Sequence, residues 1–546
     1  MPTLTFGRVS KAVMLQAVAL VAAGLVTSFF IDPRVRPFPI MLSAGIALMR
    51  VALGSRKSRR AGYGVDEDLI YLVTHMYAIS TGKPPNKRLF MPDTWAGGYD
   101  AYDSVLKRIA VLAVDWGYGF ARAIRIVARD LKNKVFRDFL LRLGELLGIG
   151  EDPSRFLDIE RRALLTEFQA HYSRILEASK MLLGVYTSGV SSAIFIMITF
   201  MIFVFLFSVS PTLIVLVYIA ILMSLAVLLY ILYKVLPRDR VTHNLKAKIP
   251  EKVRYRTLLF MGLGASAAVG MVIYKMFGSA SLALSVAALP LLIPGFYARR
   301  VEKKIREIES FFSIFIRSFG LTYAMIPHAP SALASTLRSG YGPLTKYLRR
   351  LLARLNAGID PKIAWYHFIG ETWSEVVRRN VNILYDAMNV GGDLAKVGTV
   401  LSETIFKLLD IRKQRTQMAK AFESTVYIIH TLFTAILSFV LSLMGVFNEV
   451  IGKLQGINPQ VASVLPFHPM SLQLAFQVSP IFILILSVVN ALAIKIAQGG
   501  MYETLWVPLA LLMAIGGVVM YGVSMLSQSV FANVIGLSQL MATLPK

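Results

Sequence analysis

The 546-residue sequence contains no cysteine, and charged residues make up only 16% of it. Without cysteine, disulfide frameworks, cysteine zinc sites, iron–sulfur clusters and thiol nucleophiles are excluded. Soluble domains normally carry about a quarter charged residues. Because 55% of the residues are hydrophobic, the composition predicts a polytopic membrane protein.

Acidic residues are also scarce. The sequence has 32 Asp and Glu residues and 58 Lys and Arg residues, which gives a formal net charge of +26. This charge has to lie on the polar minority of the chain, so we expect strongly basic parts outside the membrane. Such surfaces are either simply solvated or suited to an acidic partner that docks from the cytoplasm. Nucleic acid is a third option, but no basic motif interleaved with aromatic residues supports it.

Motifs of catalysis and cofactor binding are missing. The sequence has neither the G-x-x-x-x-G-K-[ST] phosphate loop nor H-E-x-x-H, and its seven histidines form no ligand-like pair on a helix face. The turns at Gly62-Tyr63-Gly64 and Gly117-Tyr118-Gly119 do not follow a predicted strand, as a dinucleotide fingerprint requires. We therefore expect no enzyme activity, no cofactor and no metal site.

Nine apolar runs are long enough to cross a hydrocarbon core of about 30 Å. They lie near residues 12–30, 38–54, 183–208, 212–235, 258–276, 279–297, 425–447, 475–496 and 504–526. The first run follows Arg8 and Lys11, as in a signal peptide, but no small-residue cleavage site follows it. We interpret it as a retained membrane anchor. The predicted fold class is an all-α polytopic membrane protein with about nine transmembrane helices.

The polar stretches between these runs predict the domain organisation. We expect an N-terminal transmembrane hairpin (1–54), a first helical module (55–182), four transmembrane helices with a basic connector at 237–257 (183–297), a second helical module (298–424), and three transmembrane helices with an outer loop at 448–474 (425–546). Basic segments flanking membrane helices favour the cytoplasm. The N-terminus and both modules are therefore predicted to be cytoplasmic, and the C-terminus to lie outside.

Few polar residues fall within the predicted spans. The deepest are Arg50, His430, Asn490 and Lys495, and an ion-coupled transporter would keep such groups for its pathway. All but Asn490 lie close enough to a helix end to reach an interface, and we interpret each of the four as a residue that snorkels or caps a helix. A row of small residues at Gly262, Ser266 and Gly270 indicates close helix packing.

The two modules share a pattern. Gly119 opens a predicted helix that ends at the turn Gly150-Glu151, and Gly358 opens one that ends at the turn Gly392-Asp393. After each turn comes a stretch without Gly or Pro, at 154–183 and 399–444. The second stretch is 46 residues, or about 70 Å of continuous helix at 1.5 Å per residue. The sequence therefore predicts a duplicated module, each copy joined to the membrane by a stiff helical rod.

Basic residues recur on the predicted helices of both modules. A face solvated by water and a face that binds an acidic partner are both compatible with this pattern. The candidate docking residues are Arg122, Arg125, Arg129, Lys132, Lys346, Arg349, Arg350, Arg354, Arg412, Lys413 and Arg415. The first four are expected on one side of a single helix that carries Phe120, Ile124, Val127, Leu131 and Val135 on another.

This layout resembles the duplicated F domain of type II secretion and type IV pilus platform proteins. The match rests on Tyr118-Gly119-Phe120 with Gly150-Glu151-Asp152, and on Ala357-Gly358-Ile359 with Gly391-Gly392-Asp393-Leu394. The extra N-terminal hairpin is similar to the archaeal branch, which assembles the archaellum. The second module departs from the pattern by placing Asp360-Pro361 directly after Gly358-Ile359.

The resemblance implies a non-enzymatic membrane platform that engages a cytoplasmic hexameric secretion ATPase and moves archaellin or pilin subunits into a filament. It implies that the basic cytoplasmic regions receive the ATPase, and a homodimer within the membrane lipids. The platform of an adhesive type IV pilus or of a type II secretion system is an alternative. A polytopic transporter with regulatory cytoplasmic domains is the alternative of another class, and it would require a continuous polar pathway through the spans.

Overall fold

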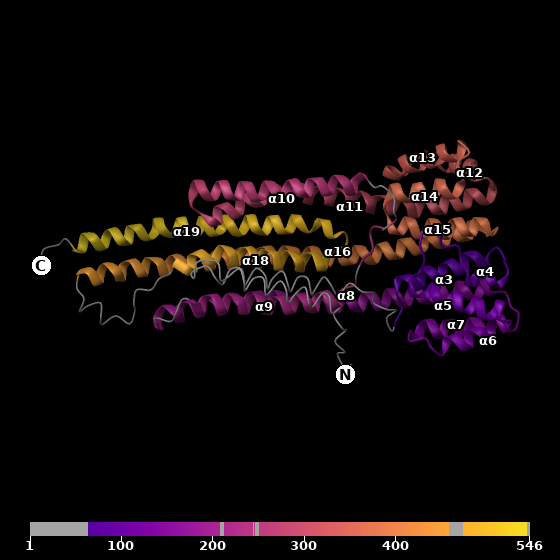
Figure 1. Cartoon of the computed structure of the whole chain (residues 1–546), viewed down its shortest axis with the longest axis horizontal. Coiled ribbons are helices and arrows are strands. Elements are labelled where there is room, and N and C mark those ends of the chain that lie inside the picture. Colours follow the sequence, from indigo (N-terminus) through magenta and orange to yellow (C-terminus); the bar gives the residue numbers. More distant parts are fainter. Residues whose placement is uncertain are drawn as a thin grey trace.

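The computed structural model is built from helices (Figure 1). It describes residues 64–207, 212–237, 239–243, 245, 250–457 and 473–542. In these ranges no strand occurs, and the only β pairing is an isolated bridge between Thr242 and Ser374. The all-α class predicted from the sequence is confirmed.

Along the chain, two groups of short helices are each followed by a group of long helices. The short ones are α3 (Glu67–Ser80), α4 (Asn86–Phe90), α5 (Ala101–Ala110), α6 (Phe120–Ala128), α7 (Lys134–Gly148), α12 (Ala329–Thr336), α13 (Thr345–Asn356), α14 (Pro361–Thr372) and α15 (Glu375–Asn389). The long ones are α8 (Pro153–Phe207), α9 (Thr212–Val235), α10 (Pro250–Phe277), α11 (Ala280–Met325), α16 (Leu394–Ile457), α18 (Gln473–Gln498) and α19 (Trp506–Ala542).

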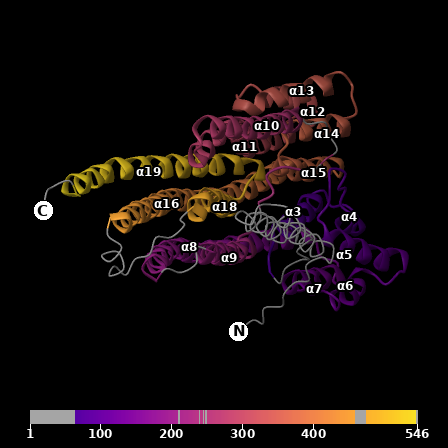
Figure 2. The ribbon, with the colours of Figure 1, turned by 60° about the vertical axis from the view of Figure 1, so that its left-hand side comes forward.

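In the described part of the chain, all seven long helices are long and apolar enough to cross a membrane. Each contains one of the last seven runs predicted from the sequence. The first two predicted spans, 12–30 and 38–54, lie outside the described residues, as does Arg50. The short helices gather at one end of the elongated molecule, as Figures 1 and 2 show. We call this end the head; it comprises α3 to α7, α12 to α15 and the adjoining ends of α8, α11 and α16.

Three long helices run without interruption from the head into the membrane-spanning bundle. The two rods predicted from the lack of Gly and Pro are confirmed as α8, with 55 residues, and α16, with 64 residues. The third is α11. The sequence predicts a span that ends at residue 297 and a separate module that begins at residue 298, but the structure joins them. The 46 residues of α11 form one helix despite Pro290 and Pro294, because packing in a bundle tolerates the loss of backbone hydrogen bonds at these positions.

The rods contact each other closely where they leave the head. A β-carbon on Gly398 of α16 would lie 2.7 Å from the carbonyl oxygen of Ile316 on α11 and 3.1 Å from Gly320 Cα. Only glycine permits this approach of the two backbones. The small-residue face predicted on α10 also packs as expected, since Ser266 Oγ donates a 2.6 Å hydrogen bond to the carbonyl of Ala287 on α11.

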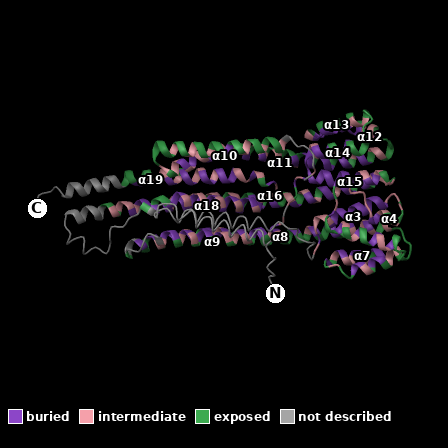
Figure 3. Ribbon diagram, in the orientation of Figure 1, coloured by how far each residue is buried: buried purple, intermediate pink, exposed green. Residues whose placement is uncertain are grey.

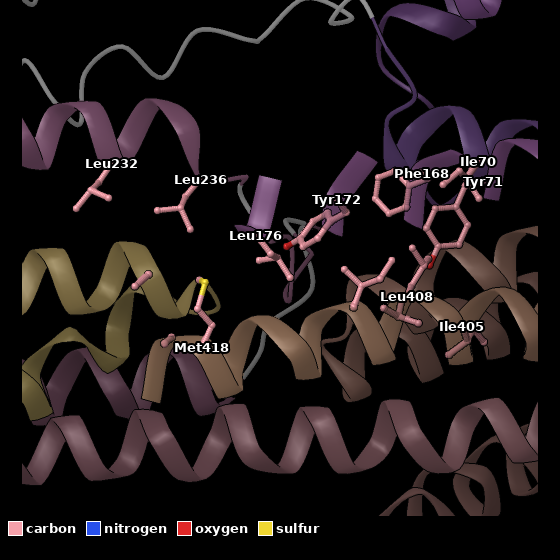
Figure 4. Close-up of a cluster of buried hydrophobic side chains, with 14 of the residues drawn as sticks. Ile70, Tyr71, Phe168, Tyr172, Leu176, Leu232, Leu236, Ile405, Leu408 and Met418 are labelled. Carbon is pink, nitrogen blue, oxygen red and sulfur yellow. The ribbon is translucent and has the colours of Figure 1, made fainter. Parts of the chain in front are cut away.

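A continuous apolar core follows the rods from the head into the spans. Figure 4 shows Tyr71 of α3 beside Phe168 of α8 and Leu408 of α16, and farther along Leu176 of α8, Leu236 after α9 and Met418 of α16. All these side chains are buried. The head therefore has no separate core of its own, and it shares its packing with the helices that carry it.

The long helix predicted after Gly119 is in fact two helices. Here α6 ends at Ala128 and α7 begins at Lys134. Asn133 explains the break, because its side chain caps α7 by accepting from the Phe136 N–H at 3.2 Å. Its amide nitrogen also donates to the Gly64 carbonyl and to the Tyr102 hydroxyl, each at 3.2 Å. Arg129 and Lys132 thus lie beyond the end of α6, and the predicted single stripe of four cations is wrong.

The helix predicted between Gly358 and Gly391 is also divided. Asp360 caps α14, which starts at Pro361. The helix stops at Trp373, whose φ of +52° is left-handed. Ser374 caps α15, and the Glu375 N–H donates to the Val241 carbonyl at 2.9 Å. The predicted basic connector thus inserts at this break, a tertiary contact that local sequence does not reveal.

Polar side chains in the membrane-spanning bundle form an internal network. His430 of α16 is fully buried, with Nε2 3.2 Å from the Leu512 carbonyl oxygen and Nδ1 3.2 Å from Asn490 Nδ2. Asn490 accepts from the Tyr186 hydroxyl at 2.8 Å. Lys495 is 3% exposed and donates to Thr504 Oγ1 at 2.6 Å. His430 and Asn490 thus join α8, α16, α18 and α19, and the interfacial or capping roles predicted for these two residues are wrong. Lys495, near the end of α18, links this helix to the 3-10 turn Tyr502–Leu505.

Candidate docking surface on the head

The outer side of the head carries the first group of predicted cations. Arg122 and Arg125 are exposed on α6, and Arg129 and Lys132 are exposed in the segment that follows it. The opposite side of α6 is buried through Ala123, Ile124, Val127 and Ala128. The Arg122 guanidinium lies 5.2 Å from the centre of the Tyr118 ring, a cation–π distance. The four cations are thus exposed on α6 and on the segment that directly follows it.

A groove lies next to these cations. It is lined by Lys107 and Arg108 of α5, by Val111, Leu112, Trp116 and Tyr118 of the following turn, and by Ile126 of α6. Trp116 is 65% exposed and Tyr118 41% exposed. Exposed aromatic residues beside arginines are the residue types that dominate protein interfaces. The sequence alone assigns no docking role to Lys107, Arg108 or Trp116, because only the fold brings them beside α6.

The backbone conformation of the 111–119 turn creates the groove. Residues Val111–Asp115 form one turn of π-helix that continues α5, and such turns are frequent at functional sites. Gly117 and Gly119 both adopt φ of +69°, which side chains other than glycine adopt at a cost. Gly119 thereby reverses the chain before α6. The positive φ of Gly119 therefore explains why glycine occupies this predicted module turn.

The second group of cations lies on α13. Lys346 and Arg349 are exposed, while the buried side of the helix carries Tyr347, Leu348 and Leu351. Arg350 and Arg354 both contact Glu371 of α14; the Arg350 distance is 3.7 Å. Arg354 is only 21% exposed and links α13 to α14. It serves packing within the head, so it is not available for docking.

Of the three predicted cations at the base of α16, Arg415 is buried and Arg412 is mostly covered. Arg415 is 2% exposed; it lies 3.2 Å from Asp239 and donates to the carbonyls of Ala497 and Ile496 at 3.0 and 2.8 Å. Arg412 is 13% exposed and lies 3.2 Å from Glu67 and 3.6 Å from Glu309. The docking role predicted for these residues is therefore wrong. Lys413 is exposed.

The predicted glycine-acidic turns join the modules to the rods. Gly150 has φ of +78°, and Glu151 is exposed. In the second turn, Gly391 has φ of +70°, whereas Gly392 is needed for space: a β-carbon there would lie 3.0 Å from the Ala387 carbonyl and 3.2 Å from the Ala78 carbonyl. The Asp393 N–H donates to Thr81 Oγ1 at 3.0 Å. This turn therefore binds the end of α3 to the start of α16.

The two halves of the head are joined by buried ion pairs. Glu375 accepts from Arg378 Nη2 at 2.6 Å and from Arg379 Nε at 2.8 Å, and Arg379 also pairs with Asp68 of α3. Burial opposes ionisation of Glu375, but the two guanidinium groups prevail and lower its pKa to about 2. Figure 3 shows that α15 and α3 are largely buried where they meet. The outer surfaces of the head are thus presented by one rigid unit.

The described residues contain no group of three or more His, Asp or Glu side chains placed to hold a metal ion. The outer side of the head presents cationic and aromatic side chains. Such a surface recognises acidic protein surfaces through charge and through insertion of aromatic side chains.

Two curated proteins match this chain over most of its length. One is flagella accessory protein J of Methanocaldococcus jannaschii, 26% identical over 488 residues, which are 84% of this chain and 84% of that protein. The chain resembles flagella accessory protein J. The protein of that name from Methanococcus voltae is 25% identical over 403 residues, 71% of each chain. The resemblance predicted from the sequence is confirmed. No family model and no solved structure matches.

Proposed function

We propose that this protein is the membrane platform of an archaellum-assembly machine, coupling a cytoplasmic secretion ATPase to the insertion of pilin-like subunits into the filament. The proposal rests on the similarity to flagella accessory protein J and, above all, on the three uninterrupted helices α8, α11 and α16 between head and spans. A displacement of the head reaches the bundle through all three together. This arrangement suits mechanical coupling, a role that requires no catalytic site in this chain.

Docking of the ATPase is assigned to the outer side of the head. The groove around Trp116 supplies an aromatic anchor, and Lys107 and Arg108 line it with positive charge. Arg122, beside Tyr118, and the exposed Arg125, Arg129 and Lys132 add further positive charge on α6 and the segment after it. On α13, Lys346 and Arg349 offer a second patch. An acidic face of the ATPase would be attracted by these charges and held at the aromatic residues.

The wider architecture follows the same proposal. In this proposal the head is cytoplasmic and the C-terminus lies outside, which agrees with the course of α19 away from the head (Figure 1). Seven spans together with the two predicted runs at 12–30 and 38–54 make nine. Each half of the head contains a glycine with positive φ, two short helices, a second such glycine and then a rod: Gly119 to α8 and Gly358 to α16. This correspondence supports a duplicated module.

The rival function, a transporter, is less well supported. The polar residues at the centre of the bundle, including His430, Asn490 and Tyr186, are fully buried and hydrogen-bonded to each other. They act as links between helices and are closed off by apolar neighbours. We also propose that the protein forms a homodimer. We favour an archaellum over an adhesive pilus or a type II secretion system.

The test is capture of a candidate hexameric secretion ATPase by the full-length, detergent-purified chain. We expect capture by the unaltered protein and a large loss with Trp116→Ala. Ile149→Ala is the matched control, because Ile149 is 73% exposed on the same head but lies outside the groove. Failure of the unaltered protein to capture the ATPase would refute the proposed coupling. Equal loss with both variants would refute the groove as its site.

A further inference from the structure

A second pocket lies between α10 and α11. Leu258 of α10 and Ile293, Phe296 and Tyr297 of α11 form its apolar part, and Arg299, Arg300 and Lys303 of α11 form its basic part. Ile293 is 61% exposed and Phe296 51% exposed. The pocket is therefore apolar at one end and cationic at the other, and it opens to the outside of the bundle.

The pocket lies at the level where both helices change from apolar to charged sequence. No charged residue occurs in α10 between Arg256 and Lys275, nor in α11 before Arg299. The two helices are held in register by Lys304 and Glu251, 3.7 Å apart. At this level the Trp506 Nε1–H donates to the Tyr255 hydroxyl at 2.9 Å. Trp and Tyr concentrate at membrane–water boundaries, so the pocket is at a bilayer surface on the head side.

The outer face of α10 is apolar and exposed. Phe260 is 70% exposed and Met261 67% exposed, and Figure 3 shows exposed residues along the length of this helix. Long exposed apolar side chains on a membrane helix are covered by acyl chains. The apolar end of the pocket is continuous with this face, since Leu258 immediately precedes it on α10.

The cations of the pocket are only partly neutralised within the described part of the chain. Arg299 lies 3.2 Å from Glu423, but Lys303 has only a 4.0 Å exposed contact with Glu307. Arg300 is exposed and forms no ion pair with any described residue. An excess of positive charge beside an acyl-lined wall fits a phosphate group that carries hydrocarbon chains.

We propose that this pocket binds an anionic phospholipid, with its phosphate between Arg300 and Lys303 and one acyl chain along Leu258, Ile293 and Phe296. The bilayer presents such a molecule at this depth and orientation. Because the headgroup would contact α11, a rod that reaches the head, lipid composition would be sensed at the base of the rods. The inference is independent of the proposed function.

The experiment uses native mass spectrometry of the full-length protein in detergent, titrated with phosphatidylglycerol or phosphatidylcholine. We expect one tightly retained phosphatidylglycerol and no equivalent phosphatidylcholine. Arg300→Gln with Lys303→Gln should weaken retention about tenfold or more, since each cation near a bilayer surface contributes about 1 kcal/mol. The matched control is Lys346→Gln with Arg349→Gln, which removes the same charge from the exposed face of α13 and should leave retention unchanged.

Each remaining outcome overturns the proposal. Equal loss in both double variants would mean general attraction to a basic protein. Equal retention of the two lipids would mean that the acyl chain alone binds. Displacement of the lipid by inorganic phosphate, followed by retention of phosphate itself, would identify an anion site without lipid specificity. Because Arg300 and Lys303 are exposed, an unchanged melting temperature in lipid-free detergent confirms that the variant is folded.

Discussion

His75 Nε2 lies 2.9 Å from Asp386 Oδ2, and both side chains are fully buried between α3 and α15. The two residues are 311 positions apart in the sequence. Asp386 also pairs with Arg88 and accepts from the Asp93 N–H at 2.9 Å, while His75 Nδ1 lies 2.8 Å from the Tyr99 hydroxyl. Burial raises the pKa of Asp386, but these partners outweigh it and hold the pKa below its usual value. This contact fixes one half of the head against the other.

Replacing Asp386 should therefore separate the halves. Asp386→Asn keeps the shape but removes the charge, and breaking a buried ion pair costs about 3 kcal/mol. We expect a clearly lower melting temperature in detergent. Asp130→Asn is the control, because Asp130 is 64% exposed and pairs only with the exposed Arg108; surface pairs contribute at most about 1 kcal/mol. Equal melting of the two variants would contradict the role given to Asp386.

The stability of the head should depend on acid pH through Glu375. Its pKa falls from 4.5 in the unfolded chain to about 2 in the fold, so its stabilising effect is complete above pH 4.5 and is lost as the pH falls toward 2. The shift corresponds to about 3 kcal/mol. Urea unfolding followed between pH 5 and 2.5 should show this decline. Glu375→Gln should be less stable at pH 5 and show a flatter profile; an unchanged slope would contradict the assignment.

Charge reversal on the head should affect binding more than folding. Changing Arg122, Arg125 and Arg129 together to Glu should slow association with the ATPase and weaken its salt dependence. Arg155, Arg174 and Lys180, all exposed on α8, supply a control with the same change of charge. Stopped-flow association at two salt concentrations measures both. If the α8 variant slows association equally, these cations act only through net charge; if neither does, the face is merely solvated.

The close crossing of α11 and α16 should be sensitive to a single methyl group. Gly398→Ala places a β-carbon 2.7 Å from the Ile316 carbonyl, and relieving such a clash costs about 1 to 3 kcal/mol. Gly184→Ala is the matched control in α8, where a β-carbon meets nothing within 4 Å. It should raise stability by about 0.5 to 1 kcal/mol. Thermal unfolding that moves in the same direction for both would contradict the close packing.

The mechanical role of α16 is testable without changing its register. Gln417, Lys420 and Ser424 are exposed where the helix leaves the head, so their side chains are dispensable for packing. Replacing all three by Gly weakens the helix by about 1 kcal/mol per residue relative to replacement by Ala. Filament assembly should fall in the Gly variant and persist in the Ala variant, with equal ATPase capture. Equal assembly would show that stiffness of α16 is not required.

The sequence by itself determined the features that depend on local composition. Runs of apolar residues predicted all seven described spans, because crossing a bilayer imposes length and hydropathy on each segment separately. The absence of Gly and Pro predicted the rods α8 and α16. The glycines at positions 119, 150 and 358 predicted turns that the structure confirms by their positive φ.

Tertiary structure decided whatever depends on partners distant in the chain. The helix breaks at Asn133 and Trp373 are held by contacts with Gly64 and with Val241. Arg415 reads as a surface cation from its neighbours in sequence, yet carbonyls of α18 and Asp239 surround it. Burial of a charge is permitted only where several such partners converge. These partners come from segments far apart in the chain, so only the fold brings them together around Arg415.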